Sequence, residues 1–271
     1  MLFYIENLRR ELKIRNYSPK TLKAYELALR KYLKFVNWEI LGQVEEMVKD
    51  FLLYEKEHNI APKTLNVYLS AVKFFYRHVV EVPCELDIKF SKTRRRLPVV
   101  MSNEEIMAII RTLANFKHRL IISLAYGAGL RVSEVANLRC GDLDFVQGTI
   151  FISNSKNGSD RYTLLPDRLG SELKEYSLGR DHYDLLFLSN RGGKMSTRTL
   201  QKIFKIAAKK VGASPFATFH SLRHSFASEL LGAGVNLRYI QQLLGHRNIR
   251  TTEIYTHIDH AKFLAKIKSP F

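Results

Sequence analysis

The sequence of 271 residues predicts a mainly α-helical protein with one small antiparallel β-sheet, divided into two domains. Apolar residues recur at intervals of three and four through most of the chain, which is typical of helices that bury one face. Apolar and polar residues alternate in 143–152 and 161–166, which indicates short paired strands. No βαβ series and no G-x-G-x-x-G motif is present, so a nucleotide-cofactor site is not expected.

The first ninety residues contain only helical patterns, over 5–15, 19–36, 44–57 and 62–80. Two of these helices begin alike, with NYSPKTLKAY at 16–25 and NIAPKTLNVY at 59–68. Proline is favoured at the first helical position, because the N–H that it lacks would be unpaired there anyway. Free amides at a helix N-terminus beside a lysine or threonine can bind a phosphate. The alternative interpretation of the two segments is that they are ordinary helix starts in a bundle. The residues expected to contact phosphate are Lys20, Thr21, Lys63 and Thr64.

The segment DIKFSKTRRRLPV at 87–99 breaks the helical pattern and is expected to be a basic linker. Its cluster of arginines comprises Arg94, Arg95 and Arg96. The linker divides the chain into a domain over 1–86 and a domain over 100–271. A basic linker would lie along an extended polyanion as the two domains close round it, and a solvated charge run is the alternative.

The second domain mixes helices with the strands. Ser102 with Glu105 indicates a capping box that opens a helix. A buried helix over about 117–126 precedes the glycine-bearing YGAGLR, and a further helix starts within 131–138. The turn between the strands is SKNGSD at 155–160. Further helices are expected over 167–177, 197–211, 221–231 and 237–244.

The balance of charge indicates a polyanionic partner. Lysine and arginine number 43 against 26 aspartate and glutamate, which gives a net charge of +17 and a pI near 9.8. Both 1–98 and 99–271 are basic, so the charge is not confined to a tail. Neutralising phosphates releases condensed counterions, so a polyanion contacted by both parts, such as double-stranded DNA, is the simplest kind of partner. A basic but otherwise ordinary enzyme is the alternative.

The cysteines and the apolar segments indicate in which cellular compartment the protein is expected. Cys84 and Cys140 lie in different segments without CxxC spacing, so neither a disulfide framework nor a metal cluster is indicated. The first residues contain no signal-peptide core, and the uncharged run at 120–130 is too short to cross a bilayer. We expect a soluble, cytoplasmic protein without membrane contact.

Cleaving a phosphodiester without a metal requires a nucleophile, donors for the growing charge on two phosphate oxygens, and a proton for the leaving oxygen. The acidic residues are scattered, so no carboxylate cage for Mg²⁺ and no other cofactor is indicated. Guanidinium groups can substitute for the metal, since each presents a planar fork of donors that matches two phosphate oxygens. The candidate catalytic residues are Arg131, Lys156, His220, Arg223, His246 and Tyr255.

The series GLRVSE, SK, HSLRHSFAS and LLGHRNIRTTEIYTH resembles the active-site series of the tyrosine recombinases, the phage-integrase family, and most closely its short Xer-type members. The similarity extends over nearly the whole chain. It implies an N-terminal helical core-binding bundle of SAM-like fold and a C-terminal tyrosine-recombinase catalytic domain. It also implies a site-specific DNA recombinase that needs neither metal nor ATP and acts as a tetramer on two DNA sites.

The resemblance implies a role for each basic candidate around the phosphate. Arg131 and Arg223 would clamp the scissile phosphate. His220 and His246 would hydrogen-bond it and assist proton transfer to and from the nucleophile. Glu134, one turn after Arg131, would orient that helix or an arginine, and a plain surface glutamate is the alternative.

The resemblance assigns the remaining steps to a tyrosine and a lysine. Tyr255 would attack the phosphate, leaving a 3′-phosphotyrosyl enzyme and a free 5′ hydroxyl. A phenol titrates near about 10, so its proton needs an acceptor at neutral pH. Lys156 would protonate the leaving 5′ oxygen. The chain departs from the family at this turn, where a second lysine often stands in the place of Ser159.

Other classes stay open. The segment 224–246 resembles two helices around a glycine-bearing turn, so a non-catalytic helix-turn-helix protein is one alternative. Type IB topoisomerases use the same chemistry on one duplex, so relaxation without recombination is another. His220 and His224 have the spacing of a zinc pair, but Ser221 stands where a metalloprotease needs glutamate and Arg223 would repel a cation.

The C-terminal tail suggests how protomers assemble. Phe263, Leu264 and Ile267 lie on one potential helix face within 259–271, and we expect this tail to dock into a neighbouring protomer. Packing on its own domain is the alternative. Because the sequence shows no basic arm domain before Met1, we do not expect an arm-type phage integrase. A second recombinase or a DNA translocase stays open as a partner, as does the choice between chromosome or plasmid dimer resolution and mobile-element integration or excision.

Overall fold

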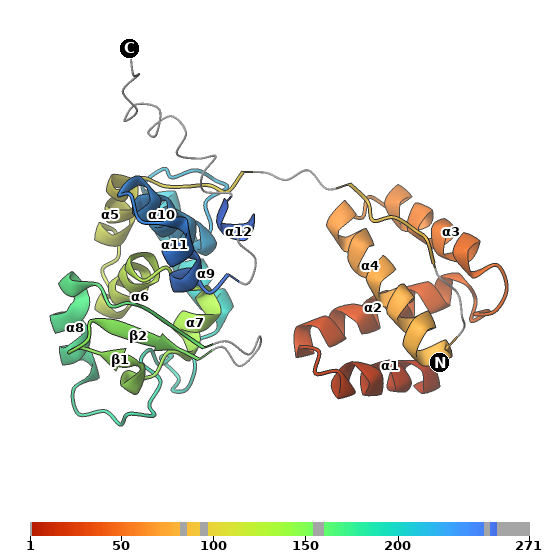
Figure 1. Cartoon of the computed structure of the whole chain (residues 1–271), viewed down its shortest axis with the longest axis horizontal. Helices are drawn as coiled ribbons and strands as arrows, with labels where there is room; N and C mark the ends of the chain where they lie inside the picture. Colours follow the sequence, from red (N-terminus) through yellow and green to blue (C-terminus); the bar gives the residue numbers. More distant parts are fainter. Residues whose placement is uncertain (1, 82–85, 93–96, 154–159, 247–249, 254–271) are drawn as a thin grey trace, which may run out of the picture. The chain divides into compact units, whose positions relative to one another are not determined.

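The structure is a computed structural model that describes residues 2–81, 86–92, 97–153, 160–246 and 250–253. The chain divides into two compact units, Met1–Arg96 and Leu97–Phe271, called here the N-terminal and C-terminal units. Each has a hydrophobic core of its own. Figure 1 shows helices only in the N-terminal unit, and helices together with the strands in the C-terminal unit. The expected mainly α-helical fold with a small antiparallel sheet is confirmed.

Four helices form the N-terminal unit. They are α1 (Leu2–Ile14), α2 (Pro19–Phe35), α3 (Val44–Glu57) and α4 (Pro62–Phe75). The helix expected over 62–80 changes its winding after α4 and continues as a π-helical turn over Tyr76–Val80. In the core, the hydroxyl groups of Tyr32 and Tyr76 hydrogen-bond to each other at 2.8 Å, so both buried phenols have a polar partner.

The repeated segments of the N-terminal unit are junctions between helices. Asn16 and Asn59 have left-handed backbone conformations, with φ of 54° and 60°, and they follow the ends of α1 and α3. The proline three residues later is the first residue of the next helix in both cases. The junctions differ at the cap, where Ser18 accepts a hydrogen bond from the N–H of Thr21 but Ala61 offers no side-chain acceptor.

The segment after this bundle is fixed on α4. Leu86 is buried, and Asn66 of α4 donates to the carbonyl of Ser91 at 3.1 Å and accepts from its N–H at 2.8 Å. Lys73 donates to the carbonyl of Ile88 at 2.8 Å. Residues 86–91 therefore belong structurally to the N-terminal unit.

Eight α-helices are described in the C-terminal unit. They are α5 (Asn103–Arg111), α6 (Phe116–Gly127), α7 (Val132–Asn137), α8 (Asp167–Ser177), α9 (Thr197–Lys210), α10 (Phe219–Gly232), α11 (Leu237–Leu244) and α12 (Arg250–Glu253). The capping box expected at the start of α5 is present, with Ser102 and Glu105 each accepting from the backbone of the other. Within the described residues, no helix combines the length and the apolar character needed to cross a membrane.

The sheet is small and antiparallel. Its strands are β1 (Leu143–Asp144), β2 (Thr149–Ile152) and β3 (Arg161–Leu164), in the order β1-β2-β3. Ile152 pairs with Arg161, so β2 and β3 flank the expected turn, of which 154–159 lie outside the described residues. The hydroxyl of Thr163 donates to the carbonyl of Ala128 at 2.9 Å, which attaches β3 to the turn after α6.

The turn after α6 lies close to α10. Gly129 has a positive φ of 62°, and a Cβ at this position would lie 2.4 Å from a ring carbon of Phe226. A glycine is required here both for the backbone conformation and for the close approach. Phe226 belongs to a small cluster with Ala227, Ile240 and Leu244 that joins α10 to α11.

We predict that Gly129→Ala lowers the stability of the C-terminal unit by about 2–5 kcal/mol, because left-handed strain adds to overpacking against α10. Gly170→Ala is the matched control. Gly170 lies within α8 with open space around its Cβ position, so alanine there should raise stability by about 0.5–1 kcal/mol. Thermal unfolding by calorimetry checks both changes, and a wild-type transition in Gly129→Ala would contradict the prediction.

Candidate active site

Four of the expected catalytic residues lie in the described part of the chain: Arg131, His220, Arg223 and His246. Arg131 immediately precedes α7, and His246 follows the residue that ends α11. His220 and Arg223 lie in the first turns of α10, one helical turn apart. Lys156 and Tyr255 lie outside the described residues.

The side chain of Arg223 is fully buried between two backbone segments. Its Nη1 donates to the carbonyl of Gly129 at 2.8 Å, and its Nη2 donates to the carbonyl of Leu244. The first carbonyl belongs to the turn after α6, and the second belongs to the last residue of α11. Arg223 therefore joins these segments, and its guanidinium is closed to solvent in this conformation.

Glu134 in the first turn of α7 is the acidic partner of the arginines, and its side chain is only 10% exposed. It accepts from the backbone N–H of Arg131 at 2.7 Å and from Nη1 of the same residue at 2.7 Å. Arg161 of β3 donates to both carboxylate oxygens, at 2.8 and 2.9 Å. Nη1 of Arg223 lies 3.8 Å from Oε2. Glu134 thus orients arginines, and the alternative of a plain surface glutamate is wrong.

The surroundings keep Glu134 ionised. Burial raises the pKa of this carboxyl, but hydrogen bonds and charge from Arg161, the N–H of Arg131 and the charge of Arg223 together lower the pKa to about 2. A carboxyl whose pKa is lower in the folded state stabilises that state above its ordinary pKa of 4.5. This stabilisation is lost as the pH falls from about 4.5 toward 2.

Arg161 also belongs to this site, although it is not among the catalytic residues expected from the sequence. Along β3, Arg161 and Thr163 face the interior, whereas Tyr162 and Leu164 are exposed. A charged residue at an inward-facing position of a strand needs a buried partner. The signal that could have identified Arg161 is therefore its place in the alternation of RYTL.

The turn after α11 holds His246. Gly245 ends the helix with a left-handed φ of 61°, and the N–H of His246 donates to the carbonyl of Gln241 at 3.1 Å. Nε2 of Gln241 donates to the carbonyl of His246 at 2.9 Å. Nδ1 of His246 lies 3.0 Å from the hydroxyl of Thr252, a fully buried residue of α12. The turn and α12 are therefore connected through the imidazole.

The surroundings of the site favour the neutral form of its histidines. Burial, followed by the charges of Arg223 and Arg131, lowers the pKa of His246 to about 3. Desolvation of the ring, followed by the charges of the same two arginines, also lowers the pKa of His220. His224 packs against His220 with ring centroids 4.6 Å apart, and burial lowers its pKa to about 4. A neutral imidazole has one nitrogen that can accept a proton.

Positive charge predominates at the site, where three guanidinium groups share the carboxylate of Glu134. The side chain of Arg131 is 32% exposed, so part of its guanidinium faces solvent. A hollow of about 480 Å³ lies beside these groups, lined by Asp160, Arg161, Arg238, Gln241, Gln242, Gly245 and His246. Of the three guanidinium groups, the partly exposed one of Arg131 can meet an anion such as a phosphate, whereas those of Arg161 and Arg223 are engaged within the protein.

Metal ligands do not gather in the part of the chain that the structure describes. His220 and His224 lie together, but no group of three or more histidine, cysteine, aspartate or glutamate residues there could hold a metal ion. The arrangement found instead is one of fixed guanidinium donors.

The helix starts of the N-terminal unit present the residues expected to contact phosphate. Lys20 and Lys63 are exposed, and Thr21 and Thr64 are half-buried. The hydroxyl of Thr21 lies 2.9 Å from that of Ser18. The arginine cluster of Arg94, Arg95 and Arg96 lies outside the described residues.

Solved structures resemble the chain over nearly its whole length. The crystal structure of XerA recombinase is 28% identical, with a TM-score of 0.57, and 98% of this chain and 99% of that chain are covered. The crystal structure of XerH site-specific recombinase bound to palindromic difH substrate, a post-cleavage complex, shares the fold. It has a TM-score of 0.75 at 24% identity, covering 93% of this chain and 80% of that chain.

Sequence comparison identifies the family. The chain is 33% identical over 260 residues to tyrosine recombinase XerA of Thermococcus kodakarensis, covering 94% of this chain and 90% of the relative. It is 32% identical over 281 residues to tyrosine recombinase XerC of Lactobacillus leichmannii, covering 95% and 94%. The phage integrase family model matches residues 99–262, and the phage integrase N-terminal SAM-like domain matches residues 4–86. The chain belongs to the phage integrase family and is a tyrosine recombinase, an enzyme that breaks and rejoins DNA strands.

Proposed function

We propose that this site-specific recombinase cleaves DNA through Tyr255, which attacks the scissile phosphate and forms a 3′-phosphotyrosyl intermediate. The bond between phosphorus and the 5′ oxygen breaks, and this oxygen takes up a proton and leaves as a hydroxyl group. The phosphotyrosyl bond keeps the free energy of the phosphodiester, so a 5′ hydroxyl can reverse the reaction without ATP. No metal or other cofactor takes part.

The observation that carries this proposal is the convergence of the described candidate residues on one site. Arg131 and Arg223 lie around Glu134, and both arginines influence the titration of His220 and His246. Thr252, three residues before Tyr255 in the sequence, contacts the imidazole of His246. The chain that leads to the nucleophile thus starts beside the arginines.

The arginines would stabilise the charge that grows on the phosphate oxygens. Fixed donors aimed at such charge commonly contribute about 2.7–4 kcal/mol each. Arg131 is partly exposed and can meet a phosphate directly. Arg223 is fully buried, so it reaches a phosphate only after the segment that covers it moves. The end of α11 is the segment expected to move, because the carbonyl of its Leu244 accepts the hydrogen bond from Nη2 of Arg223.

The proton transfers would involve the histidines and the lysine. Neutral His220 and His246 would hydrogen-bond the phosphate and exchange a proton with Tyr255, in keeping with the lowered pKa of both imidazoles. Lys156 would protonate the leaving 5′ oxygen.

DNA contacts would extend beyond the catalytic residues. The exposed lysines at the starts of α2 and α4 and the arginines after residue 92 are proposed to contact the phosphate backbone of the DNA. The residues in question are Lys20, Thr21, Lys63, Thr64, Arg94, Arg95 and Arg96.

Recombination requires four protomers on two DNA sites, and the tail at 259–271 is proposed to dock into a neighbouring protomer. A second recombinase or a DNA translocase is compatible with this scheme. The proposed biological roles are resolution of chromosome or plasmid dimers and integration or excision of a mobile element. Relaxation of a single duplex, as by a type IB topoisomerase, would not need this assembly.

Covalent capture tests the nucleophile. On a nicked suicide substrate, which prevents rejoining, we expect wild type to form an SDS-resistant protein–DNA adduct. Tyr255→Phe should form none, because phenylalanine has no nucleophilic oxygen. Tyr239→Phe is a matched control, since Tyr239 is a 64% exposed tyrosine of α11, and it should react like wild type. Adduct formation by Tyr255→Phe would disprove the assignment.

Removal of a clamping arginine should slow the same reaction. We expect Arg223→Ala to form the adduct about 100- to 1000-fold more slowly, because one donor to the developing charge is lost. Single-turnover adduct formation at saturating DNA gives the rate. An unchanged rate would remove Arg223 from the phosphate clamp.

A sulfur-substituted substrate tests Lys156. We expect Lys156→Ala to slow cleavage of an ordinary phosphodiester by about 100-fold or more, because the leaving oxygen lacks its proton donor. A substrate with sulfur in place of the bridging 5′ oxygen should restore the rate, since a thiol of pKa about 8.5 leaves as the thiolate without protonation. Arg131→Ala should stay slow on both substrates. Failure of sulfur to restore Lys156→Ala would contradict the role.

Truncation tests the tail. Deleting residues 259–271 should abolish tetramer formation on DNA without weakening DNA binding, because the apolar stripe of the tail loses its partner surface. Native electrophoresis and analytical ultracentrifugation of the DNA complexes distinguish the two effects. Unchanged assembly would reject docking between protomers.

A further inference from the structure

Three arginines of the site donate to three consecutive backbone carbonyls. Nε of Arg161 lies 2.7 Å from the carbonyl oxygen of residue 243, Nη2 of Arg223 bonds to that of residue 244, and Nη2 of Arg131 lies 3.4 Å from that of residue 245. These carbonyls end α11, where a helix leaves its last acceptors without intrahelical donors. The arginines therefore fix the end of the helix that His246 follows.

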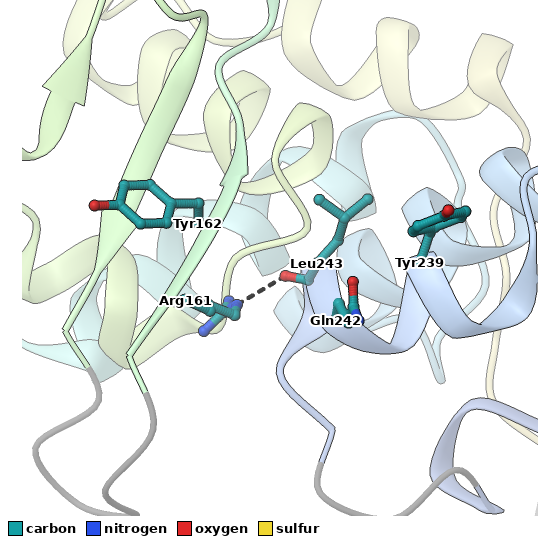
Figure 2. Close-up of a pocket in the computed structure, with 5 residues that line it drawn as sticks. All are labelled: Arg161, Tyr162, Tyr239, Gln242 and Leu243. Carbon is teal, nitrogen blue, oxygen red and sulfur yellow. Dashed lines mark hydrogen bonds between the residues drawn. The ribbon is translucent and has the colours of Figure 1, made fainter.

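Arg161 is the most completely engaged of the three. Its Nη1 and Nη2 donate to the two oxygens of Glu134 at 2.8 and 2.9 Å, while its Nε donates to the carbonyl of Leu243. Each of its three nitrogens thus has an acceptor, and its side chain is only 6% exposed. Figure 2 shows this side chain extending from β3 toward α11, with Tyr162 beside it pointing away. Arg161 is directed at other site residues rather than at solvent.

The stem of Arg161 also packs on the turn that holds His246. A Cβ at Gly245 would lie 2.8 Å from Cδ of Arg161, and Gly245 has a left-handed φ of 61°. The glycine of the sequence LGH is therefore needed both to end α11 and to admit the arginine stem. Arg161 contacts the carboxylate on one side of the site and the histidine turn on the other.

We propose that Arg161 is a positioning residue for strand cleavage, which holds Glu134 and the end of α11 together and thereby sets the positions of Arg131, Arg223 and His246. This proposal rests on the proposed function, because it concerns the same reaction. Arg161 acts through Glu134 and the carbonyl of Leu243, and it does not touch the phosphate itself.

A lysine in place of Arg161 could not make all of these contacts. Only a guanidinium presents two parallel donors to a carboxylate and a third donor at a fixed angle to another acceptor. Loss of Arg161 would leave Glu134 to the remaining arginines and release the carbonyl of Leu243. Arg131 and Arg223 would then shift relative to a bound phosphate, and a misplacement of about 1 Å can slow a reaction roughly 100-fold.

The test measures single-turnover adduct formation on the nicked substrate at saturating DNA, together with DNA affinity and folding by circular dichroism. The variants are Arg161→Gln, Arg161→Lys, Glu134→Gln and the double variant with both glutamines. Arg180→Gln is the matched structural control, since Arg180 also donates to two backbone carbonyls, those of Leu185 and Leu186, away from the site.

We expect Arg161→Gln to cleave about 100-fold more slowly than wild type with unchanged DNA affinity. Arg161→Lys should recover only part of this loss. Glu134→Gln should also be slow, and the double variant should be no slower than the slower single variant, because both changes disrupt one unit. Arg180→Gln should lower the melting temperature and cleave at the wild-type rate.

Several results would overturn the proposal. A wild-type rate in Arg161→Gln would remove the positioning role, as would multiplicative losses in the double variant. An equal loss in Arg180→Gln would show that destabilisation alone slows cleavage. If Arg161→Gln fails to fold, the cleavage rate of the double variant is the test instead. The double variant lacks the buried carboxylate of Glu134 as well as Arg161, so no charge is left buried without its partner. A wild-type protein that binds DNA without forming the adduct would overturn the proposed function itself, whereas a reactive wild type with a reactive Arg161→Gln overturns this proposal alone.

Discussion

The carboxylate of Glu134 lies among the guanidinium groups of Arg131, Arg161 and Arg223, which come from the start of α7, from β3 and from α10. Three cations brought together out of water would repel one another and lose hydration, which is costly for buried charges. The ionised carboxylate offsets much of this cost and fixes the side chains by hydrogen bonds. One negative charge does not neutralise three positive charges, so the site keeps a net attraction for an anion. The negative charge of a bound phosphate group would neutralise the excess positive charge.

Backbone carbonyls supply the other acceptors that the arginines need. The last carbonyls of α11 are accessible because the helix ends there, and they carry the negative end of the helix dipole. Their bonds to the arginines make the position of α11 and the positions of the guanidinium groups interdependent. His246 and Thr252 follow in the chain and contact each other. The arginines, the end of α11, His246 and Thr252 are therefore parts of one connected structure, and the proposed contact of Arg223 with a phosphate requires a movement of α11.

The repeated segments of the N-terminal unit have a structural cause of their own. Asn16 and Asn59 adopt the left-handed conformation after a helix, and the proline that follows starts the next helix. The lysines of the repeats are exposed, in keeping with a role at the DNA backbone, but the asparagine and proline are explained by the junctions alone. In each repeat, the asparagine and the proline form the junction between two helices, and the lysine is exposed at the start of the second helix.

The sequence by itself determined the helices, the paired strands, the capping box at Ser102 and the family, because periodicity, caps and motifs are local patterns. It also selected Arg131, His220, Arg223 and His246, which the fold brings together. Lys156 and Tyr255, outside the described residues, stay predictions from the sequence. Only the tertiary structure decided that Arg223 is fully buried, that Glu134 is shared by arginines, and that Arg161 joins β3 to α11. Except for the contact of Arg131 with Glu134, these contacts link residues 21 to 94 positions apart. A local pattern carries no information on which distant partner a buried charge will meet.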